Sequence, residues 1–121
     1  IDVIADFIPE LEVYGNPKGE LLVLSWGGTY GACRAAVEKA NKNKISVSHV
    51  NLKYINPFPK NLGEILLKYK KVLIPEINLG QLSTIIRSKY LIDTLNLNRV
   101  SGKPFTTTDI YEEIEKIIKE N

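Results

Sequence analysis

The clearest candidate for acid–base chemistry is Glu76, which interrupts an apolar run in the segment "VLIPEINLGQL" (72–82). A carboxylate at a strand end can act as a general acid, but proton transfer needs a second titrating group within reach. Asn78 and Gln81 form hydrogen bonds and do not titrate. We therefore interpret Glu76 as a carboxylate that binds loop amides or a group across a domain contact. Its candidate interface segment contains Glu76, Asn78, Gly80 and Gln81.

A second candidate is the glycine turn "WGGTYG" (26–31). Gly27 and Gly28 would let backbone amides approach an anion at the start of a helix. The pattern is neither G-x-G-x-x-G nor a P-loop, which favours a tight strand-to-helix turn in which Gly31 permits close packing. Anion or interface contact stays the alternative for Gly27, Gly28, Thr29 and Tyr30.

Other reactive side chains are few. Cys33 is the only cysteine and His49 the only histidine, so the chain has no set of soft ligands for zinc or an iron–sulfur cluster. His49 lies in an apolar strand pattern and Cys33 among alanines, which favours structural roles for both. Ser25 lacks a G-x-S-x-G elbow. We expect no catalytic residue and no metal site.

Apolar runs alternate with helical patterns along the chain. Strands are predicted over 20–26, 45–55, 71–76 and 94–100. Helices are predicted over 32–44, 60–70 and 80–92, and a last one beginning near 106–109, where a Thr can cap the helix and Asp109 complements its positive start.

Helical spacing also predicts which side chains are buried. The inward faces are Leu62, Ile65, Leu66 and Tyr69 in one helix, Leu82, Ile85, Ile86 and Tyr90 in the next, and Ile110, Ile114, Ile117 and Ile118 in the last. The solvent face of the last helix is Glu112, Glu113, Lys116 and Lys119.

This order is β-α repeated four times, with residues 11–14 as a further strand before it. Such alternation predicts an α/β fold with a mostly parallel sheet of about five strands covered by helices on both faces. Ligands of such sheets bind beyond the carboxyl ends of the strands, so "NPFPKN" (56–61) and "SGKPF" (101–105) join the two segments above at one edge. We expect residues 1–10 to be a lead-in from a preceding domain and 11–121 to form one α/β domain.

Composition is that of a globular protein, with 44% hydrophobic and 25% charged residues among 121. No apolar run approaches the ~20 residues that cross a bilayer, and the N-terminus lacks a secretory pattern. The single cysteine favours a reducing, cytoplasmic setting. The sequence contains no Met, which suggests a chain cut from something longer.

The charges are unevenly distributed, because residues 21–108 hold 13 Lys and Arg against 4 Asp and Glu. Such a basic body can bind phosphates, nucleic acid or an acidic partner protein, but lysine-rich surfaces are usually only solvated. We expect neither nucleic acid nor a membrane as a partner.

Three stretches together resemble a known family: "SWGGTYGACRAAVEKA", "NLKYINPFPKNLGEILLKYKKVLIPEINLGQLSTIIRSKYL" and "LNRVSGKPFTTTDIYEEI". They are similar to the C-terminal region of the α subunit of 2-oxoacid:ferredoxin oxidoreductases, most closely the 2-oxoglutarate branch, over about residues 11 to 118. The combination of "NPFP" with "PE-x-N-x-GQ" is the specific part. Gly28 stands where the family more commonly has Ser, which removes a hydroxyl from the turn.

The resemblance implies a transketolase C-terminal-like domain, a three-layer α/β/α unit whose first strand, here residues 11–14, runs antiparallel to the rest. It implies membership of an enzyme that oxidatively decarboxylates a 2-oxoacid to its acyl-coenzyme A and reduces ferredoxin. Thiamine diphosphate, magnesium and an iron–sulfur cluster would belong to the full complex, with none bound by this domain alone. The implied partners are preceding domains of the α subunit and a β subunit, with ferredoxin and coenzyme A for the full enzyme.

The leading hypothesis is thus a non-catalytic module for domain packing and subunit assembly. One alternative is a module that binds an anion, such as the phosphates of coenzyme A, through its basic body and helix starts. The other is the C-terminal domain of a related thiamine enzyme, such as a pyruvate or branched-chain dehydrogenase β subunit or a transketolase.

Overall fold

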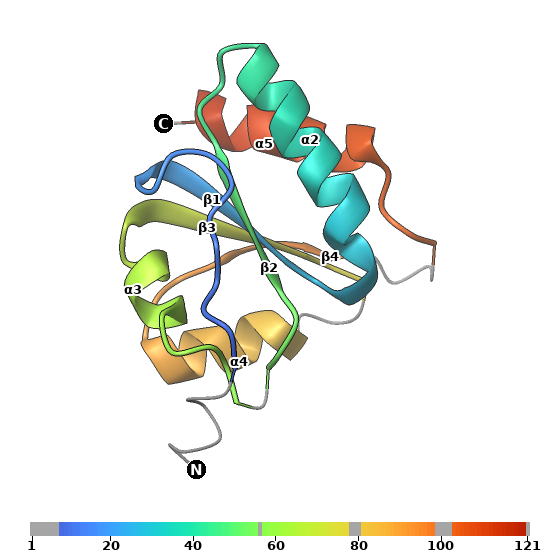
Figure 1. The fold of residues 1–121 in the computed structure, drawn as a ribbon. Helices are drawn as coiled ribbons and strands as arrows, with labels where there is room; N and C mark the ends of the chain where they lie inside the picture. The colour runs from blue at the N-terminus through green and yellow to red at the C-terminus, as the bar shows by residue number, and fades with distance from the viewer. Residues whose placement is uncertain (1–7, 56, 78–80, 99–102, 121) are drawn as a thin grey trace.

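The computed structural model describes residues 8–55, 57–77, 81–98 and 103–120, and their strands form one parallel sheet (Figure 1). The strands are β1 (Gly19–Trp26), β2 (Ser48–Leu52), β3 (Tyr69–Glu76) and β4 (Leu95–Asn98), in the order β2-β1-β3-β4. A 3-10 turn η1 (Gly27–Thr29) leads into helix α2 (Tyr30–Lys42). The other helices are α3 (Leu62–Leu66), α4 (Gln81–Tyr90) and α5 (Thr107–Lys119).

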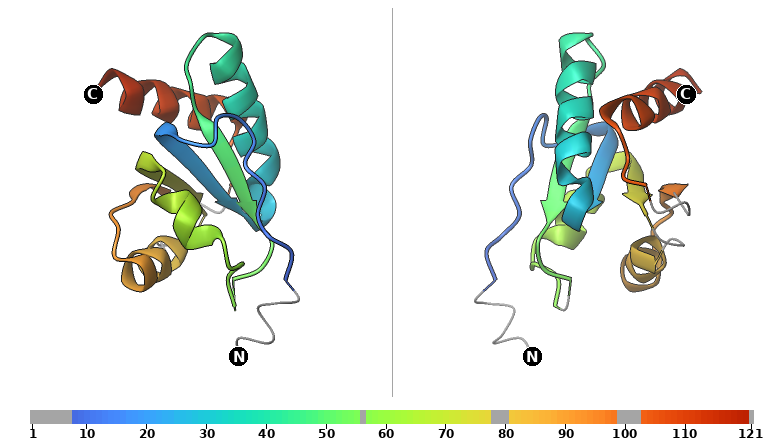
Figure 2. Two further views of the ribbon diagram at one scale, coloured as in Figure 1. Left: turned by 60° about the vertical axis from the view of Figure 1, so that its left-hand side comes forward. Right: turned by 90° about the vertical axis from the view of Figure 1, so that its right-hand side faces the viewer.

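Helices cover both faces of this sheet, as predicted. Helices α2 and α5 lie on one face and α3 and α4 on the other (Figures 1 and 2). Strand β1 alternates between them: Leu21 and Val23 join the apolar cluster under α2 and α5, and Leu22 and Leu24 join the cluster under α3 and α4. This burial on both faces explains why the sequence of β1 is a continuous apolar run.

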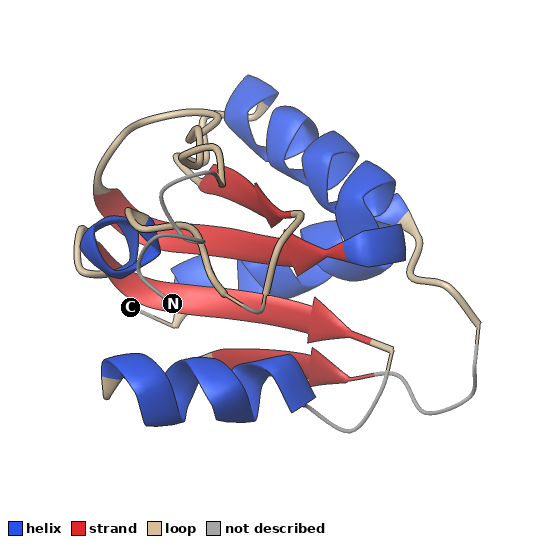
Figure 3. Ribbon diagram, turned by 60° about the horizontal axis from the view of Figure 1, so that its bottom comes forward, coloured by secondary structure: helices blue, strands red, loops and turns tan. Residues whose placement is uncertain are grey.

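All four strands are parallel, so their carboxyl ends meet at one edge of the sheet (Figure 3). The segments after β1 and β3 therefore start side by side, because these strands are neighbours in the sheet.

The predicted strand at 11–14 is reduced to a single antiparallel bridge between Tyr14 and His49. The segment runs along the outer side of β2 (Figure 2). Its other attachment is the side chain of Asn61, whose Oδ1 accepts the Leu11 amide at 2.9 Å and whose Nδ2 donates to the Leu11 carbonyl at 3.0 Å. The sheet thus has four strands where about five were expected, and the antiparallel direction of the first segment agrees with the expectation.

Two side chains lie elsewhere than their helical spacing predicts. Helix α3 ends at Leu66, and Tyr69 begins strand β3 because its backbone pairs with Gly19 of β1. Ile85 was expected inward but is 46% exposed. Only a narrow face of helix α4 packs against the sheet. Leu82 and Ile86 lie on that face, whereas Ile85 lies beside it and faces solvent.

The last helix agrees well with the prediction. Thr106 Oγ1 accepts the Asp109 amide at 3.1 Å, and Asp109 Oδ2 accepts the Thr106 amide at 3.0 Å, which is a capping box. Ile110, Ile114 and Ile117 are buried, and Ile118 packs partly buried against the same cluster.

Strand β2, in contrast, is shorter than the predicted 45–55.

Replacing Asn61 by Ala should loosen the N-terminal segment. The change removes both hydrogen bonds to Leu11, so we expect faster hydrogen exchange at the Leu11 amide and a loss of about 1–2 kcal/mol in the free energy of unfolding. Exchange measured by NMR and urea denaturation check this. The control is Lys68→Ala, an exposed side chain near the same helix, which should change stability by less than about 0.5 kcal/mol. An unchanged exchange rate at the Leu11 amide would show that the two hydrogen bonds of Asn61 do not hold this segment in place.

Candidate functional site

The glycine turn and Glu76 line the same shallow depression. Its volume is about 190 Å³, and it lies where the neighbouring strands β1 and β3 end. The lining residues are Trp26, Gly27, Gly28, Thr29, Pro75, Glu76 and Ile77. The structure therefore brings together two segments that the sequence separates by almost fifty residues.

The other predicted site residues are placed differently. Tyr30 lines a separate, larger pocket. Gln81 is the first residue of α4 and is exposed. Asn78 and Gly80 lie outside the described residues.

The glycine turn is held by its own backbone and by Thr29. Gly27 has φ +62°, a left-handed conformation that glycine adopts without strain. Thr29 Oγ1 accepts the Trp26 amide at 3.3 Å and donates to the Trp26 carbonyl at 3.1 Å. A Cβ added at Gly28 would meet open space, so the turn also accommodates a larger residue there. The same is true of Gly31, so the expected close packing at that position is wrong.

Glu76 caps the start of helix α4. Its Oε1 accepts the Leu82 amide at 2.7 Å, and its Oε2 accepts the Ser83 amide at 3.0 Å. These amides belong to the first helical turn, where backbone donors have no partner within the helix and negative charge is favoured. Glu76 is thus an amide-binding carboxylate, as interpreted above, and both of its oxygens have partners within this domain.

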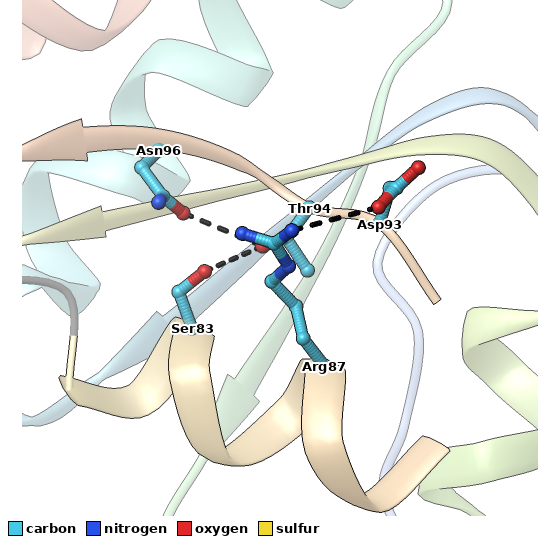
Figure 4. Close-up of polar contacts among 5 residues, drawn as sticks. All are labelled: Ser83, Arg87, Asp93, Thr94 and Asn96. Carbon is cyan, nitrogen blue, oxygen red and sulfur yellow. Dashed lines mark hydrogen bonds and ion pairs between the residues drawn. The ribbon is translucent and has the colours of Figure 1, made fainter. Parts of the chain in front are cut away.

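Ser83 also ties the same turn to the edge strand (Figure 4). Its hydroxyl bonds to Thr94 Oγ1, which donates to Asn96 Oδ1 at 3.4 Å. One turn further along α4, Arg87 pairs with Asp93 at 3.7 Å, an exposed contact of small energetic weight. The start of α4 is therefore fixed to β3 through Glu76 and to β4 through Ser83.

A larger pocket of about 640 Å³ lies beside β2. It is lined by Pro9, Glu10, Leu11, Glu12, Tyr30, Arg34, Asn51, Lys53, Tyr54 and Pro59. Two of these residues, Arg34 and Asn51, are the ends of a chain of hydrogen bonds that runs through the buried side chains of His49 and Ser25.

The direction of these bonds defines the state of His49. Arg34 Nε donates to His49 Nδ1 at 3.1 Å, so the ring proton lies on Nε2 and is donated to Ser25 Oγ at 2.7 Å. The Ser25 hydroxyl in turn donates to Asn51 Oδ1 at 2.8 Å. Burial, reinforced by the Arg34 charge, lowers the pKa of His49 to about 4. The neutral imidazole is a donor toward Ser25, so it does not act as the base that would activate this hydroxyl as a nucleophile.

The sequence alone does not predict this network, because it depends on strand register. His49 and Asn51 alternate along β2 and point to the same face, and the register pairs Asn51 with Ser25 of β1. The only signal is the presence of polar side chains at alternating positions of strands that are otherwise apolar.

Cys33 is fully buried, as expected. Burial raises the pKa of its thiol to about 12, which keeps it protonated at neutral pH. Within the described ranges, no three His, Cys, Asp or Glu side chains are grouped closely enough to hold a metal ion. None of the helices in those ranges has the length and apolar character needed to cross a membrane.

Replacing Glu76 by Ala should destabilise the fold. The change leaves two amides of α4 without their acceptor, so we expect a loss of about 1–2 kcal/mol in the free energy of unfolding, measured by urea denaturation. Glu112→Ala removes an exposed carboxylate from the middle of α5 and serves as the matched control. Equal stability of the two variants would argue against the capping role.

His49 should make stability depend on pH. Its pKa is 6.5 in the unfolded chain and about 4 in the fold, so the unfolded state binds the proton first as pH falls. The stabilisation is complete above pH 6.5 and is lost between pH 6.5 and 4, by about 3 kcal/mol in total. Urea denaturation across this range checks the slope. His49→Gln should remove this contribution, and an identical slope in that variant would disprove the assignment.

Comparison with known proteins places this geometry in a family. The family described as pyruvate:ferredoxin oxidoreductase core domain II matches residues 19–118. The 2-oxoglutarate oxidoreductase subunit KorA of Mycobacterium tuberculosis is 45% identical over 105 residues, which are 85% of this chain and 16% of that protein.

Solved structures give the same result. The chain is similar to 2-oxoglutarate:ferredoxin oxidoreductase from Magnetococcus marinus, solved with 2-oxoglutarate, coenzyme A and succinyl-CoA bound. The TM-score is 0.90 at 28% identity, covering 97% of this chain and 21% of that chain. A split-gene transketolase has a TM-score of 0.69 at 17% identity over 93% of this chain and 43% of its own, a likeness of fold alone.

This chain spans about a fifth of the length of the oxidoreductase chains that it matches. The family match covers most of its own length, and the parallel sheet with helices on both faces is that of the transketolase C-terminal domain. The chain belongs to the pyruvate:ferredoxin oxidoreductase core domain II family, the transketolase C-terminal-like domain of 2-oxoacid:ferredoxin oxidoreductase α subunits.

Proposed function

We propose that this domain is a non-catalytic module of a thiamine-diphosphate-dependent 2-oxoacid:ferredoxin oxidoreductase of the 2-oxoglutarate type. The full enzyme would oxidatively decarboxylate the 2-oxoacid to its acyl-coenzyme A and reduce ferredoxin. The module would serve domain packing and subunit assembly. Family membership and the 45% identity to a 2-oxoglutarate oxidoreductase subunit support this assignment.

The observation that carries the non-catalytic part is that the reactive side chains are engaged in holding the fold. Both Glu76 oxygens cap α4, His49 is a neutral donor toward Ser25, and Cys33 is a buried thiol. Each of these groups could do chemistry in another setting, but here each would have to break a structural contact to react.

Exposed aromatic side chains at the carboxyl edge support a docking role. Trp26 is 39% exposed at the end of β1 and lines the depression beside Glu76, and Tyr30 is 42% exposed at the start of α2. Large aromatic side chains are enriched in protein interfaces. The docking surface would consist of Trp26, the glycine turn and the start of α4 at Gln81. Glu76 would act there by positioning α4.

The cofactors would belong to other parts of the enzyme. Among the described residues no three His, Cys, Asp or Glu side chains are grouped as metal ligands, and one cysteine cannot supply the thiolates of an iron–sulfur cluster. Thiamine diphosphate would accordingly be held by the preceding domains of the α subunit and the β subunit. Ferredoxin would likewise bind to the full enzyme.

The isolated chain should therefore be inactive. We expect no reduction of a viologen dye when the chain is supplied with 2-oxoglutarate, coenzyme A, thiamine diphosphate and magnesium. A complete 2-oxoglutarate:ferredoxin oxidoreductase, assayed in parallel, is the positive control. Dye reduction that depends on the 2-oxoacid and on this chain alone would refute the non-catalytic assignment.

A second candidate function is binding of coenzyme A. It is favoured by the coenzyme A bound in the Magnetococcus marinus enzyme and by the basic composition of residues 21–108. Calorimetry of the chain with coenzyme A at low and high salt separates it from pure assembly, because phosphate contacts weaken as salt rises. The third alternative, a related thiamine enzyme, has only the likeness of fold to transketolase in its favour.

A further inference from the structure

The larger pocket presents an arginine that has no counterion among the residues that the structure describes. Arg34 is half-buried, and the described residues give it neither an ion pair nor a hydrogen-bond acceptor beyond the single bond from Nε to His49. Its guanidinium carbon lies 4.2 Å from the centre of the Tyr14 ring and 5.4 Å from that of Tyr30. Since no buried side-chain nitrogen in the described ranges lacks a partner, the terminal nitrogens of Arg34 are accessible to solvent and can pair with an anionic ligand.

The guanidinium is held in place before any ligand arrives. Its Nε is bonded to an imidazole that is itself fixed by Ser25, and Ser25 is fixed by Asn51. Two tyrosine rings restrict its remaining movement. Fixing an arginine side chain normally costs conformational entropy on binding, and this cost is already met in the fold. The two terminal nitrogens are those with no partner among the described residues, and they form the fork that matches two oxygens of a carboxylate or phosphate.

The other lining residues provide a surface for a planar ring and restrict how many anionic groups a ligand can carry. Tyr30 and Tyr54 line the pocket and are 42% and 46% exposed, so both have ring surface available for stacking. Lys53 adds a second cation, while Glu10 and Glu12 contribute carboxylates from the N-terminal segment. The two carboxylates would repel a ligand that carries several anionic groups, which favours a ligand with a single one.

We propose that this pocket binds a small ligand made of a planar ring with one carboxylate or monophosphate group. The anionic group would pair with the terminal nitrogens of Arg34 and the ring would lie against Tyr30 or Tyr54. The pocket volume of about 640 Å³ is within the range of small-molecule sites. This pocket shares Tyr30 with the docking surface around Trp26 but is a different hollow from the depression beside Glu76, and ligand binding there does not depend on the proposed assembly role.

The experiment is an NMR titration of the chain with benzoate and phenyl phosphate as probes. We expect saturable shifts of the amide signals of the pocket residues, with affinity falling as salt is raised. Phenol, which has the ring without the charge, and cyclohexanecarboxylate, which has the charge without the planar ring, should each bind more weakly. Absence of saturable shifts with both aromatic probes would overturn the proposal.

Variants test separately the anion-binding arginine and the ring-stacking tyrosines. Arg34→Gln should weaken binding of both probes by about tenfold or more, since a charge-assisted pair is lost. Lys42→Gln removes an exposed cation from the other end of α2 and should leave binding unchanged. Equal losses in the two variants would show non-specific charge attraction and overturn the site.

Tyr54→Ala keeps the test valid if Arg34→Gln unfolds the chain, because this exposed ring is dispensable for the core. This variant or a parallel Tyr30→Ala variant should weaken binding of phenyl phosphate and leave that of inorganic phosphate unchanged, because the ring would lie against one of these two tyrosines. Unchanged binding of phenyl phosphate in a parallel Tyr30→Ala variant as well as in Tyr54→Ala would contradict the ring-stacking half of the proposal.

Discussion

The structure depends on the burial of strand β1 between two neighbouring strands and two helical layers. Its residues Leu21 to Ser25 are at most 1% exposed, and every pairing in the sheet is parallel. Parallel pairing brings the ends of β2 and β3 to the two sides of Trp26. The glycine turn, Glu76 and the His49 network are therefore near one another as a consequence of core packing. Their proximity does not require contacts among the loops themselves.

The buried polar groups of this edge are paired inside the domain. No buried side-chain nitrogen or oxygen in the described ranges lacks a hydrogen-bond partner. Glu76 accepts hydrogen bonds from helix amides, and the imidazole of His49, on the edge strand β2, links α2 to the inner strand β1. A buried imidazole in this position stabilises the fold only while it is neutral, because burial disfavours its charged form and protonation would also place it beside the Arg34 cation. The same residue therefore ties stability to pH and holds Arg34 in place.

Local patterns were enough to predict the layers and most of the core. The capping box at Thr106 and the isoleucine stripe of α5 follow from spacing alone, because a helix end and a helix face are local properties. Tyr69 and Ile85 were misplaced because their environment is decided by partners distant in sequence: the pairing with Gly19 and the narrow contact of α4 with the sheet. The Ser25–His49–Asn51 network could not be predicted for the same reason, since it exists only once β1 and β2 are in register.

Glu76 shows how a residue of a motif typical of a family can hold the fold together. The carboxylate binds the amides of residues six and seven positions later, in the first turn of α4. This contact requires a long acidic side chain at the strand end and a fixed number of residues before Leu82, whose buried side chain anchors the helix in the core. The spacing of "PEINLGQL" is therefore a structural requirement of the β3–α4 connection. This connection positions the exposed start of α4 at the carboxyl edge. Loss of Glu76 would therefore affect a docked partner by displacing the helix, and no contact between the carboxylate and that partner is needed.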